Sequence, residues 1–429
     1  MAVFQEKAMV FAGKIHLRIF GYEMGEEMRK FLGHLSWSFF GGGIAAGILL
    51  GLNILAGRWL GPEEYGKYGL VIAIGSILVI PMTLGIDTAL TFYVSRDVSD
   101  SEKNENIHSS LWVIGLFIIA EASAVFLFSE QISSLLDIVE SVLIVGAIFS
   151  IFLAIRNMFD AVTRGFHFFK YQSIIRTIEA LVIFSVFISL AWKQELLTFK
   201  SYIIAMSAGY IFSNIAIAFK IRGSIGISTT HTKKIMSYGS FAILGSLFGV
   251  MTNSLDKIFI NTYMGPEQLG IYTAYSTASL LLVGQMMTLF INVFFPTLSS
   301  INDSGLILKK INKLAGIFFV PTMLGLTIAT WLIVSLFGEK YSLDWLLVIE
   351  FSFLGALTMY FTALWWLIAS KGRTGIRFTS FNGIISGVIF CLLMFIFSSN
   401  LSLYHVVLFL IISIFYNIVR GNLCYARIK

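Results

Sequence analysis

Long apolar segments, separated by short polar connections, make up most of the chain. Residues 35–57 contain no charged side chain. A helix of that length, at about 1.5 Å per residue, extends about 34 Å and can cross a hydrocarbon core of ~30 Å. The same criterion predicts six spans in the first half, at residues 35–57, 68–94, 111–129, 141–162, 173–192 and 201–219. It predicts six more in the second half, at residues 236–263, 269–296, 315–337, 345–369, 376–397 and 402–419.

The segments are predicted to be helices because each one is apolar throughout. A membrane β-barrel would instead show alternating stretches of ~10 residues. The composition agrees with a membrane protein, since 57% of the residues are hydrophobic and 13% are charged. The predicted fold class is therefore an all-α integral membrane protein with twelve transmembrane helices.

A sequence repeat divides these helices into two equal sets. Residues 265–272 (GPEQLGIY) match residues 61–68 (GPEEYGKY) at five of eight positions, at an offset of 204. The match continues upstream without a gap, where Ser36 falls on Ser240. With six spans in each copy, the copies are parallel, and a pseudo-two-fold axis along the membrane normal relates them. We expect two six-helix bundles around a central cavity, with any substrate path at their interface.

The basic residues predict the orientation in the membrane, because Lys and Arg accumulate in cytoplasmic loops. A cytoplasmic amino terminus places 23 of the 30 basic residues on the cytoplasmic side. Arg156 and Lys257 fall within the membrane, and the residues left outside are Arg58, Lys67, Lys193, Lys200 and Lys340. The sequence therefore predicts that both termini are cytoplasmic. The pI near 9.1 follows from this distribution and does not indicate nucleic-acid binding.

The predicted organisation begins with a cytoplasmic amphipathic segment, residues 1–33. Its nine charged side chains rule out a signal peptide. It is interpreted either as a surface helix that anchors or regulates the protein, or as a simple lead-in helix. The remaining units are a six-helix bundle at 34–220, a cytoplasmic linker at 221–234, a second bundle at 235–420 and a cytoplasmic tail at 421–429.

The sequence lacks the residue patterns that metal binding, cofactor binding and nucleotide hydrolysis require. The two cysteines form no CxxC pair and the six histidines form no HxxxH or HExxH pattern, so no metal and no cofactor are predicted. No GxxxxGK[ST] motif occurs, and the longest connections, residues 95–110 and 220–235, are too short for a nucleotide-hydrolysing domain. Work must therefore come from an ion gradient or from the substrate gradient.

Three stretches of sequence resemble one known family. GRWLGPEEYGKYGL, LGIDTALTFYVSR and SLDKIFINTYMGPEQLGIYTAYSTA are similar to the polysaccharide-export (Wzx-type) flippases of the MOP exporter superfamily. The resemblance covers nearly the whole chain. It implies alternating-access transfer of undecaprenyl- or dolichyl-linked oligosaccharides across the cytoplasmic membrane. It also implies membrane lipids and glycan-assembly proteins as partners, with H+ or Na+ as a coupling ion.

Two other classes remain as alternatives to a flippase. One is a multidrug (MATE-like) cation-coupled small-molecule exporter, although residues 35–57 lack the acidic residue that archaeal-type members carry in the first span. The other is a polytopic membrane enzyme, which would need a larger aqueous loop with clustered carboxylates or histidines. A flippase for a sugar-diphosphate head group should have a cationic cavity, whereas an exporter's cavity would be apolar or acidic.

Charged side chains inside the membrane are the site candidates, because each costs ~2.5–3.5 kcal/mol on insertion scales. The phosphate-binding candidates are Arg156, Lys257, Arg58 and Arg96. For Arg156 the alternative is an ion pair with Asp160, one turn further along the helix. For Arg58 and Arg96 the alternative is a role as interfacial anchors whose long side chains reach water.

Three carboxylates are candidates for binding the coupling ion, namely Asp87, Glu121 and Asp256. Asp256 has a structural alternative, which is an ion pair with a base such as Arg58. Two further carboxylates receive no such role. Glu179 is expected to pair with Arg176 three residues away, and Glu350 lies close enough to the outer surface to be partly hydrated.

Glycine and proline predict the turns and bends. Gly61 and Gly265, each followed by proline, are expected to form tight outer hairpins, because glycine ends a helix and proline begins the next. Pro81 and Pro321 lie inside predicted spans, where a missing N–H favours a kink.

Overall fold

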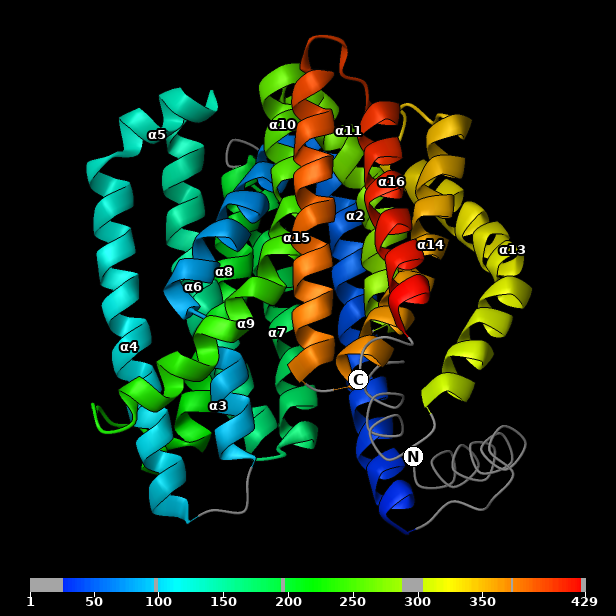
Figure 1. The fold of residues 1–429 in the computed structure, drawn as a ribbon. Coiled ribbons are helices and arrows are strands. Elements are labelled where there is room, and N and C mark those ends of the chain that lie inside the picture. The colour runs from blue at the N-terminus through cyan, green and yellow to red at the C-terminus, as the bar shows by residue number, and fades with distance from the viewer. Residues whose placement is uncertain (1–25, 96–98, 194–196, 288–303, 372, 426–429) are drawn as a thin grey trace.

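The structure, a computed structural model, describes residues 26–95, 99–193, 197–287, 304–371 and 373–425. Every regular element within these ranges is a helix (Figure 1). The predicted all-α fold class is thereby confirmed. In Figure 1, α2 begins and α16 ends toward the lower side, which we call the lower end of the molecule. The opposite side is the upper end.

The helices follow one another with short connections. Those before the linker are α2 (Glu26–Thr83), α3 (Ile86–Val94), α4 (Asp100–Leu127), α5 (Ser129–Leu136), α6 (Glu140–Gly165), α7 (Phe169–Ala191) and α8 (Phe199–Lys220). Those after it are α9 (Thr232–Asn253), α10 (Leu255–Met264), α11 (Pro266–Ser276), α13 (Ser304–Phe337), α14 (Trp345–Ala369), α15 (Arg373–Ile396) and α16 (Leu403–Cys424). Three short elements are η2 (Arg222–Ser224), the π-helical η3 (Thr277–Leu281) and η4 (Ser398–Asn400).

The chain reverses direction at Gly61, in the middle of α2. Its φ of 78° and ψ of 170° are not helical, and Pro62 then begins the second arm. The two arms lie together, because Tyr65 on the second donates a hydrogen bond to Asn53 on the first (3.2 Å). The second copy repeats this turn at Gly265, with φ 86° and ψ 169°, between α10 and α11. Both predicted hairpin turns are confirmed.

The two hairpins cross each other at a pair of glycines. A Cβ placed on Gly66 would lie 1.8 Å from the carbonyl oxygen of Pro266, and a Cβ on Gly270 would lie 1.8 Å from that of Pro62. Each residue here is related to its counterpart by the 204-residue offset of the sequence repeat. The repeat therefore forms a local two-fold contact, in which only glycine lets the two backbones approach so closely.

The helices form two lobes with α9 between them. In the first lobe α2 packs with α6, α7 and α8, whereas in the second α14 packs with α13, α15 and α16 (Figure 1). Ile235, near the start of α9, is buried with Ile86 and Leu90 of α3 in the first lobe. Met251, near the end of α9, contacts Gly387 of α15 in the second lobe. α9 thus crosses from one lobe to the other.

The predicted second span, residues 68–94, is not one helix. It breaks at Leu84 and Gly85, which have positive φ values of 46° and 68°, so that α3 is a separate helix. Pro81 stays inside α2, and the break follows it. A Cβ on Gly239 of α9 would lie 2.5 Å from the Leu84 carbonyl oxygen, so the broken segment packs tightly against α9. Hydropathy reports burial and not backbone geometry, so it did not predict this break.

The predicted seventh span, residues 236–263, is also divided. Ser254 has φ −132° and ψ −44° and separates α9 from α10. Polar residues at this point favour a break, because their side chains compete for backbone partners. The Asn253 side chain, for example, donates to the carbonyl oxygen of Gly249 (3.0 Å). This break comes immediately before Asp256 and places that carboxylate in the first turn of a new helix.

Within the described ranges, nine helices are long and apolar enough to cross a membrane. One of them, Gly42–Thr83, contains the Gly61 turn and therefore holds parts of two predicted spans. The predicted eighth span, 269–296, extends beyond the described residues. The protein is thus a multi-pass membrane protein, and the count of twelve stays a prediction. Residues 1–25, most of the predicted amphipathic segment, also lie outside the described ranges.

Candidate functional site

Four charged side chains meet in the first lobe between α6 and α7. Arg156 donates from Nε to Glu179 Oε2 (3.0 Å) and from a terminal nitrogen to Glu179 Oε1 (2.5 Å). Arg176 pairs with Asp160 at 2.5 Å, and Gln172 donates to the other Asp160 oxygen at 3.0 Å. The side chains of Glu179 and Asp160 are only 2% and 5% exposed. Two positive and two negative charges therefore balance one another in an apolar environment.

This cluster changes the interpretation of Arg156. The expected pairs, Arg156 with Asp160 and Arg176 with Glu179, are present at 3.9 and 3.7 Å. The shorter contacts are the crossed ones, in which each arginine binds the carboxylate of the other pair. The Arg156 guanidinium also lies 4.5 Å from the centre of the Tyr210 ring. A phosphate would have to displace Glu179, so this geometry favours the ion pair, and the phosphate role stays a prediction.

A second charged group lies at the break between α9 and α10. Asp256 is buried, with 1% of its surface exposed, and accepts a hydrogen bond from the Tyr272 hydroxyl (2.6 Å). Its other oxygen, Oδ1, has no hydrogen-bond partner among the described residues and lies 3.7 Å from Lys257 Nζ. Lys257 Nζ instead donates to the Asn253 carbonyl oxygen at 2.5 Å. The ion pair is therefore long, and the ammonium is held mainly by a backbone group.

The base that pairs with Asp256 is Lys257 rather than the expected Arg58. Adjacent helix positions diverge by ~100°, but the flexible lysine stem curls back toward the preceding turn. An ammonium carries three donors. One donor is used by a carbonyl, and the Lys257 side chain is 15% exposed. Lys257 therefore has N–H groups left that can donate hydrogen bonds to an anion.

The two remaining basic candidates lie at helix ends. Arg58 is exposed near the end of the first arm of α2, next to the exposed Trp59. Its stem lies against Gly338, where a Cβ would be 3.7 Å from Arg58 Cγ. This position suits both an interfacial anchor and a phosphate ligand, so both interpretations stay open. Arg96 lies outside the described residues.

The carboxylate candidates differ in their environments. Glu121, on α4, has both carboxyl oxygens buried and without a hydrogen-bond partner in the part of the chain that the structure describes. Asp87 is half-buried in the first turn of α3, where the helix dipole favours a negative charge. Glu350, on α14, is half-buried with one oxygen unpartnered. Their role in ion coupling stays a prediction. In the described part of the chain, no three His, Cys, Asp or Glu side chains converge as metal ligands.

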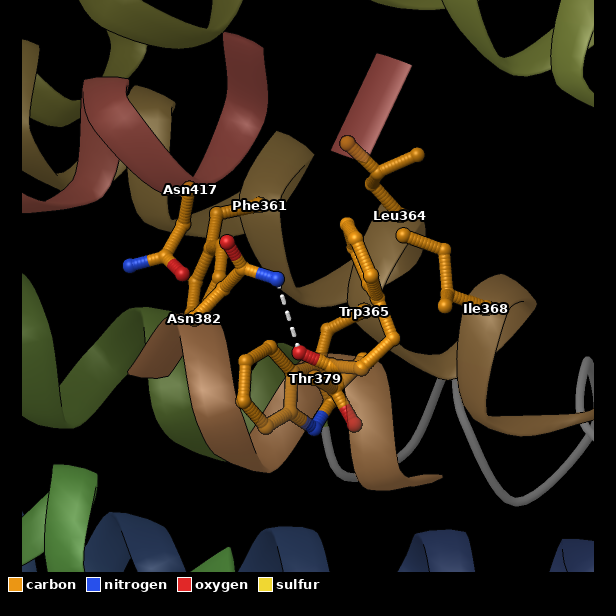
Figure 2. Close-up of a pocket in the computed structure, with 8 residues that line it drawn as sticks. Phe361, Leu364, Trp365, Ile368, Thr379, Asn382 and Asn417 are labelled. Atoms are coloured by element: carbon orange, nitrogen blue, oxygen red, sulfur yellow. Dashed lines mark hydrogen bonds between the residues drawn. The ribbon is translucent and has the colours of Figure 1, made fainter. Parts of the chain in front are cut away.

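A small pocket lies in the second lobe between α14, α15 and α16 (Figure 2). The rings of Phe361 and Trp365 and the amides of Asn382 and Asn417 line it. Arg420 Nε donates to Asn382 Oδ1 at 3.4 Å, and Asn417 is bonded within the α15–α16 interface. Aromatic faces beside amides are chemistry that suits neutral polar groups such as hydroxyls.

The sequence search did not identify this pocket because it considered only ionisable residues. A signal was nevertheless present in the spacing of neutral polar residues. Thr379, Asn382 and Ser386 recur every three or four positions on α15, as do Ser413 and Asn417 on α16. Such spacing marks one polar face on an otherwise apolar helix, and polar faces of neighbouring membrane helices pair with each other.

Residues 32–302, more than half of the chain, match the family model described as polysaccharide biosynthesis protein. The chain belongs to this family. A relative from Shigella flexneri, named as an O-antigen transporter, is 23% identical over 340 residues, which cover 72% of this chain and 77% of that protein. The resemblance to Wzx-type flippases of the MOP superfamily is thereby confirmed.

Solved structures show that this polysaccharide biosynthesis protein has a two-lobed transporter fold. The lipid II flippase MurJ in an inward closed conformation is 16% identical, with a TM-score of 0.70, over 91% of this chain and 87% of that one. A multidrug resistance MATE transporter of the MOP superfamily, in an inward-facing conformation, is 13% identical, with a TM-score of 0.64, over 88% and 94%. At such identities the similarity concerns the fold alone.

Proposed function

We propose that this protein transfers lipid-linked oligosaccharides from the inner to the outer leaflet of the cytoplasmic membrane. The sugar-diphosphate head group passes between the two lobes, while the polyprenyl tail stays in the bilayer. The lower end, where α2 begins and α16 ends, faces the cytoplasm, in accordance with the distribution of basic residues. The protein makes and breaks no covalent bond in this process, and it acts beside glycan-assembly proteins.

Three findings support the proposal. The family is one of polysaccharide biosynthesis, and the Shigella relative is named as a transporter of O-antigen. The fold is shared with a protein named as a lipid II flippase. The two hairpins meet at Gly66 and Gly270 in a two-fold contact about which one lobe can rock against the other.

The structural observation that carries the proposal is the state of Lys257. Arg156 is fully engaged by Glu179, whereas Lys257 has one carbonyl bond and one carboxylate at 3.7 Å. A diphosphate can therefore bind the Lys257 ammonium without breaking a short ion pair. Asp256 would then lose the one counter-charge that the described residues give it, and a proton or cation bound there would restore neutrality. In this way the binding of substrate and of the coupling ion are linked.

The other carboxylates are candidates for the same coupling ion. The described residues offer no donor to either buried oxygen of Glu121, and a buried carboxylate without a partner is costly unless it is protonated or binds a cation. Asp87, beside the break at Gly85, is the third candidate. We propose that H+ or Na+ at one or more of these groups supplies the work of transport.

The proposal is tested by flipping in vesicles that contain defined undecaprenyl-diphosphate-linked sugars. Lys257→Asn, which installs the residue found at the equivalent position of the first hairpin, should lower the flipping rate by about tenfold, the loss of roughly one charge-assisted contact. Lys67→Asn is the matched control, since Lys67 is neutralised by Glu63 and Glu64 at 2.8 and 2.7 Å. Equal rates for wild type and Lys257→Asn would remove Lys257 from the site.

A cation-coupled small-molecule exporter is the alternative favoured by one observation, the unpartnered carboxyl group of Glu121. The same vesicles distinguish the two functions. An exporter would expel cationic dyes when an ion gradient is imposed and would leave lipid-linked sugars in their leaflet. A flippase would transfer the lipid-linked sugars and would not expel the dyes.

A further inference from the structure

Two basic side chains lie on facing turns at the upper end of the boundary between the lobes, on the side where Lys and Arg are scarce. In the predicted orientation, five basic residues lie there. Lys67 is neutralised by two glutamates. Arg58 and Lys340 have no such partner among the described residues, and they come from different lobes, at the end of the first arm of α2 and directly after α13. Basic residues at this membrane side need a specific reason.

The two side chains pack reciprocally against glycines of the opposite lobe. A Cβ on Gly61 would lie 3.7 Å from Lys340 Cδ and 3.8 Å from its Nζ. A Cβ on Gly338 would lie 3.7 Å from Arg58 Cγ and 3.8 Å from its Nε. Both glycines have positive φ, 78° and 99°, which disfavours any side chain at these positions. Each cationic stem therefore packs over the glycine turn of the opposite segment.

The segments that carry these charges are fixed to each other. The Tyr341 hydroxyl donates to the Gly57 carbonyl oxygen at 2.8 Å. The Phe337 ring lies so close to Gly57 that a Cβ there would be 2.3 Å from it. Residues 57–61 of the first lobe and 337–341 of the second thus form one closed contact. Arg58 and Lys340 are held near each other by this contact and not by attraction between them.

No carboxylate of the described ranges balances the two charges. The ion pairs found there involve other residues, and Glu339, next to Lys340, joins none of them. Two like charges held together repel each other, and an anion between them removes the repulsion. A guanidinium beside an ammonium suits phosphate, which accepts hydrogen bonds on several oxygens. The exposed Trp59 beside Arg58 is typical of head-group depth.

We infer that Arg58 and Lys340 form a phosphate-binding site that closes the upper end of the lobe boundary. Its ligand is the phosphate group of an outer-leaflet lipid. The source is either a bilayer phospholipid or the diphosphate of the transported lipid; the second source rests on the proposed function, whereas the first does not. Because the site needs both lobes, a bound phosphate stabilises the closed upper end, and separation of the lobes releases it.

Binding of two lipid probes to the purified full-length protein in detergent tests this site. Native mass spectrometry would measure the affinity for phosphatidylglycerol and for undecaprenyl diphosphate. The double substitution Arg58→Gln/Lys340→Gln should weaken at least one of them by about tenfold or more, and Lys340→Gln alone by several-fold. Lys67→Gln, the matched control, should leave both affinities unchanged. A loss confined to one probe identifies the source of the phosphate.

Thermal shift gives an independent readout that does not depend on transport. The effective probe should raise the melting temperature of the wild type and of Lys67→Gln, and should not raise that of the double variant. Unchanged affinities and an unchanged thermal shift in the double variant would overturn the inference. If the wild type fails to flip lipid-linked sugars while the double variant loses phosphate binding, the proposed function is refuted and the phosphate site is retained.

Discussion

The two hairpins of the repeat share their backbone and differ in their charge. In the first, Tyr68 donates to Asn53 at 3.5 Å, a contact between two neutral groups. In the second, Tyr272, the equivalent of Tyr68 by the 204-residue offset, donates to Asp256, and Lys257 stands at the position of Asn53. The tyrosine and the glycine–proline turn thus maintain the same hairpin in both copies. The second copy adds a buried charge pair to this frame.

The lobes also differ in how they compensate membrane charge. The first lobe contains four charges in short, reciprocal ion pairs, with Arg156 and Glu179 at their centre. The second contains a pair at 3.7 Å with one carboxylate oxygen unbonded. A tight neutral cluster stabilises packing, whereas a loose pair can exchange its partner for a ligand. We therefore propose a structural role for the first lobe's charges and a binding role for those of the second.

The largest expected effect comes from breaking the contact that the two hairpins share. Gly66→Leu would push a side chain into the carbonyl of Pro266, 1.8 Å from the Cβ position, and separate the crossing helices. Overpacking of this kind costs about 3 kcal/mol or more, so folded protein should be lost on size-exclusion chromatography. Gly51→Leu is the control, because no atom of the described ranges lies within 4 Å of its Cβ position. A folded Gly66→Leu protein with a wild-type melting temperature would disprove the close crossing.

The sequence predicted the parts of the fold that depend on periodicity and on local backbone chemistry. The apolar spans, the parallel repeat and the turns at Gly61 and Gly265 follow from such features. The breaks at Leu84 and Ser254 were not predicted, because hydropathy registers neither the tertiary contact of Leu84 with Gly239 nor the local hydrogen bonding of the polar residues before Asp256. Hydropathy is the same whether a span is continuous or broken.

The second-largest effect is expected from substitutions that test whether the first lobe's charges are structural. Arg156→Met would leave Glu179 buried and without its main partner, which costs about 3–5 kcal/mol. The double variant Arg156→Met/Glu179→Met removes both charges, keeps the Arg176–Asp160 pair, and should recover most of this loss. Melting temperatures in detergent measure both changes. A stable double variant that no longer flips lipid-linked sugars would contradict the structural role and return Arg156 to the phosphate site.

The candidate site was less predictable than the fold. Sequence alone identified which ionisable residues lie in the membrane, because burial of charge is rare there. It did not predict which ones pair, since the pairing of Arg156 with Glu179 on another helix depends on packing. Nor did it indicate that Arg58 packs against Gly338 and Lys340 against Gly61, because these segments are far apart in sequence. Long-range proximity is the information that one sequence lacks.

The smallest expected effect concerns a brace that only the second hairpin has. Tyr275 of α11 donates to the Ser342 carbonyl oxygen at 2.9 Å and accepts from the Asp344 N–H at 2.7 Å. Asp344 caps α14 by accepting from the Leu346 N–H at 2.8 Å. Asp344→Asn retains this cap in part, whereas Asp344→Ala removes it and should lower stability by about 1 kcal/mol.

The pH dependence of the cap separates its charge from its hydrogen bonds. The Tyr404 hydroxyl, which donates to Asp344, lowers the pKa of that carboxyl below its ordinary value. A lowered folded pKa means that the carboxylate stabilises the folded state above the ordinary pKa and loses this effect as the pH falls through the lowered value. The stability difference between wild type and Asp344→Asn should therefore be largest near neutral pH and shrink in acid. A difference that grows on acidification would show that the charge at this cap opposes folding, and the brace would then depend on Tyr275 alone.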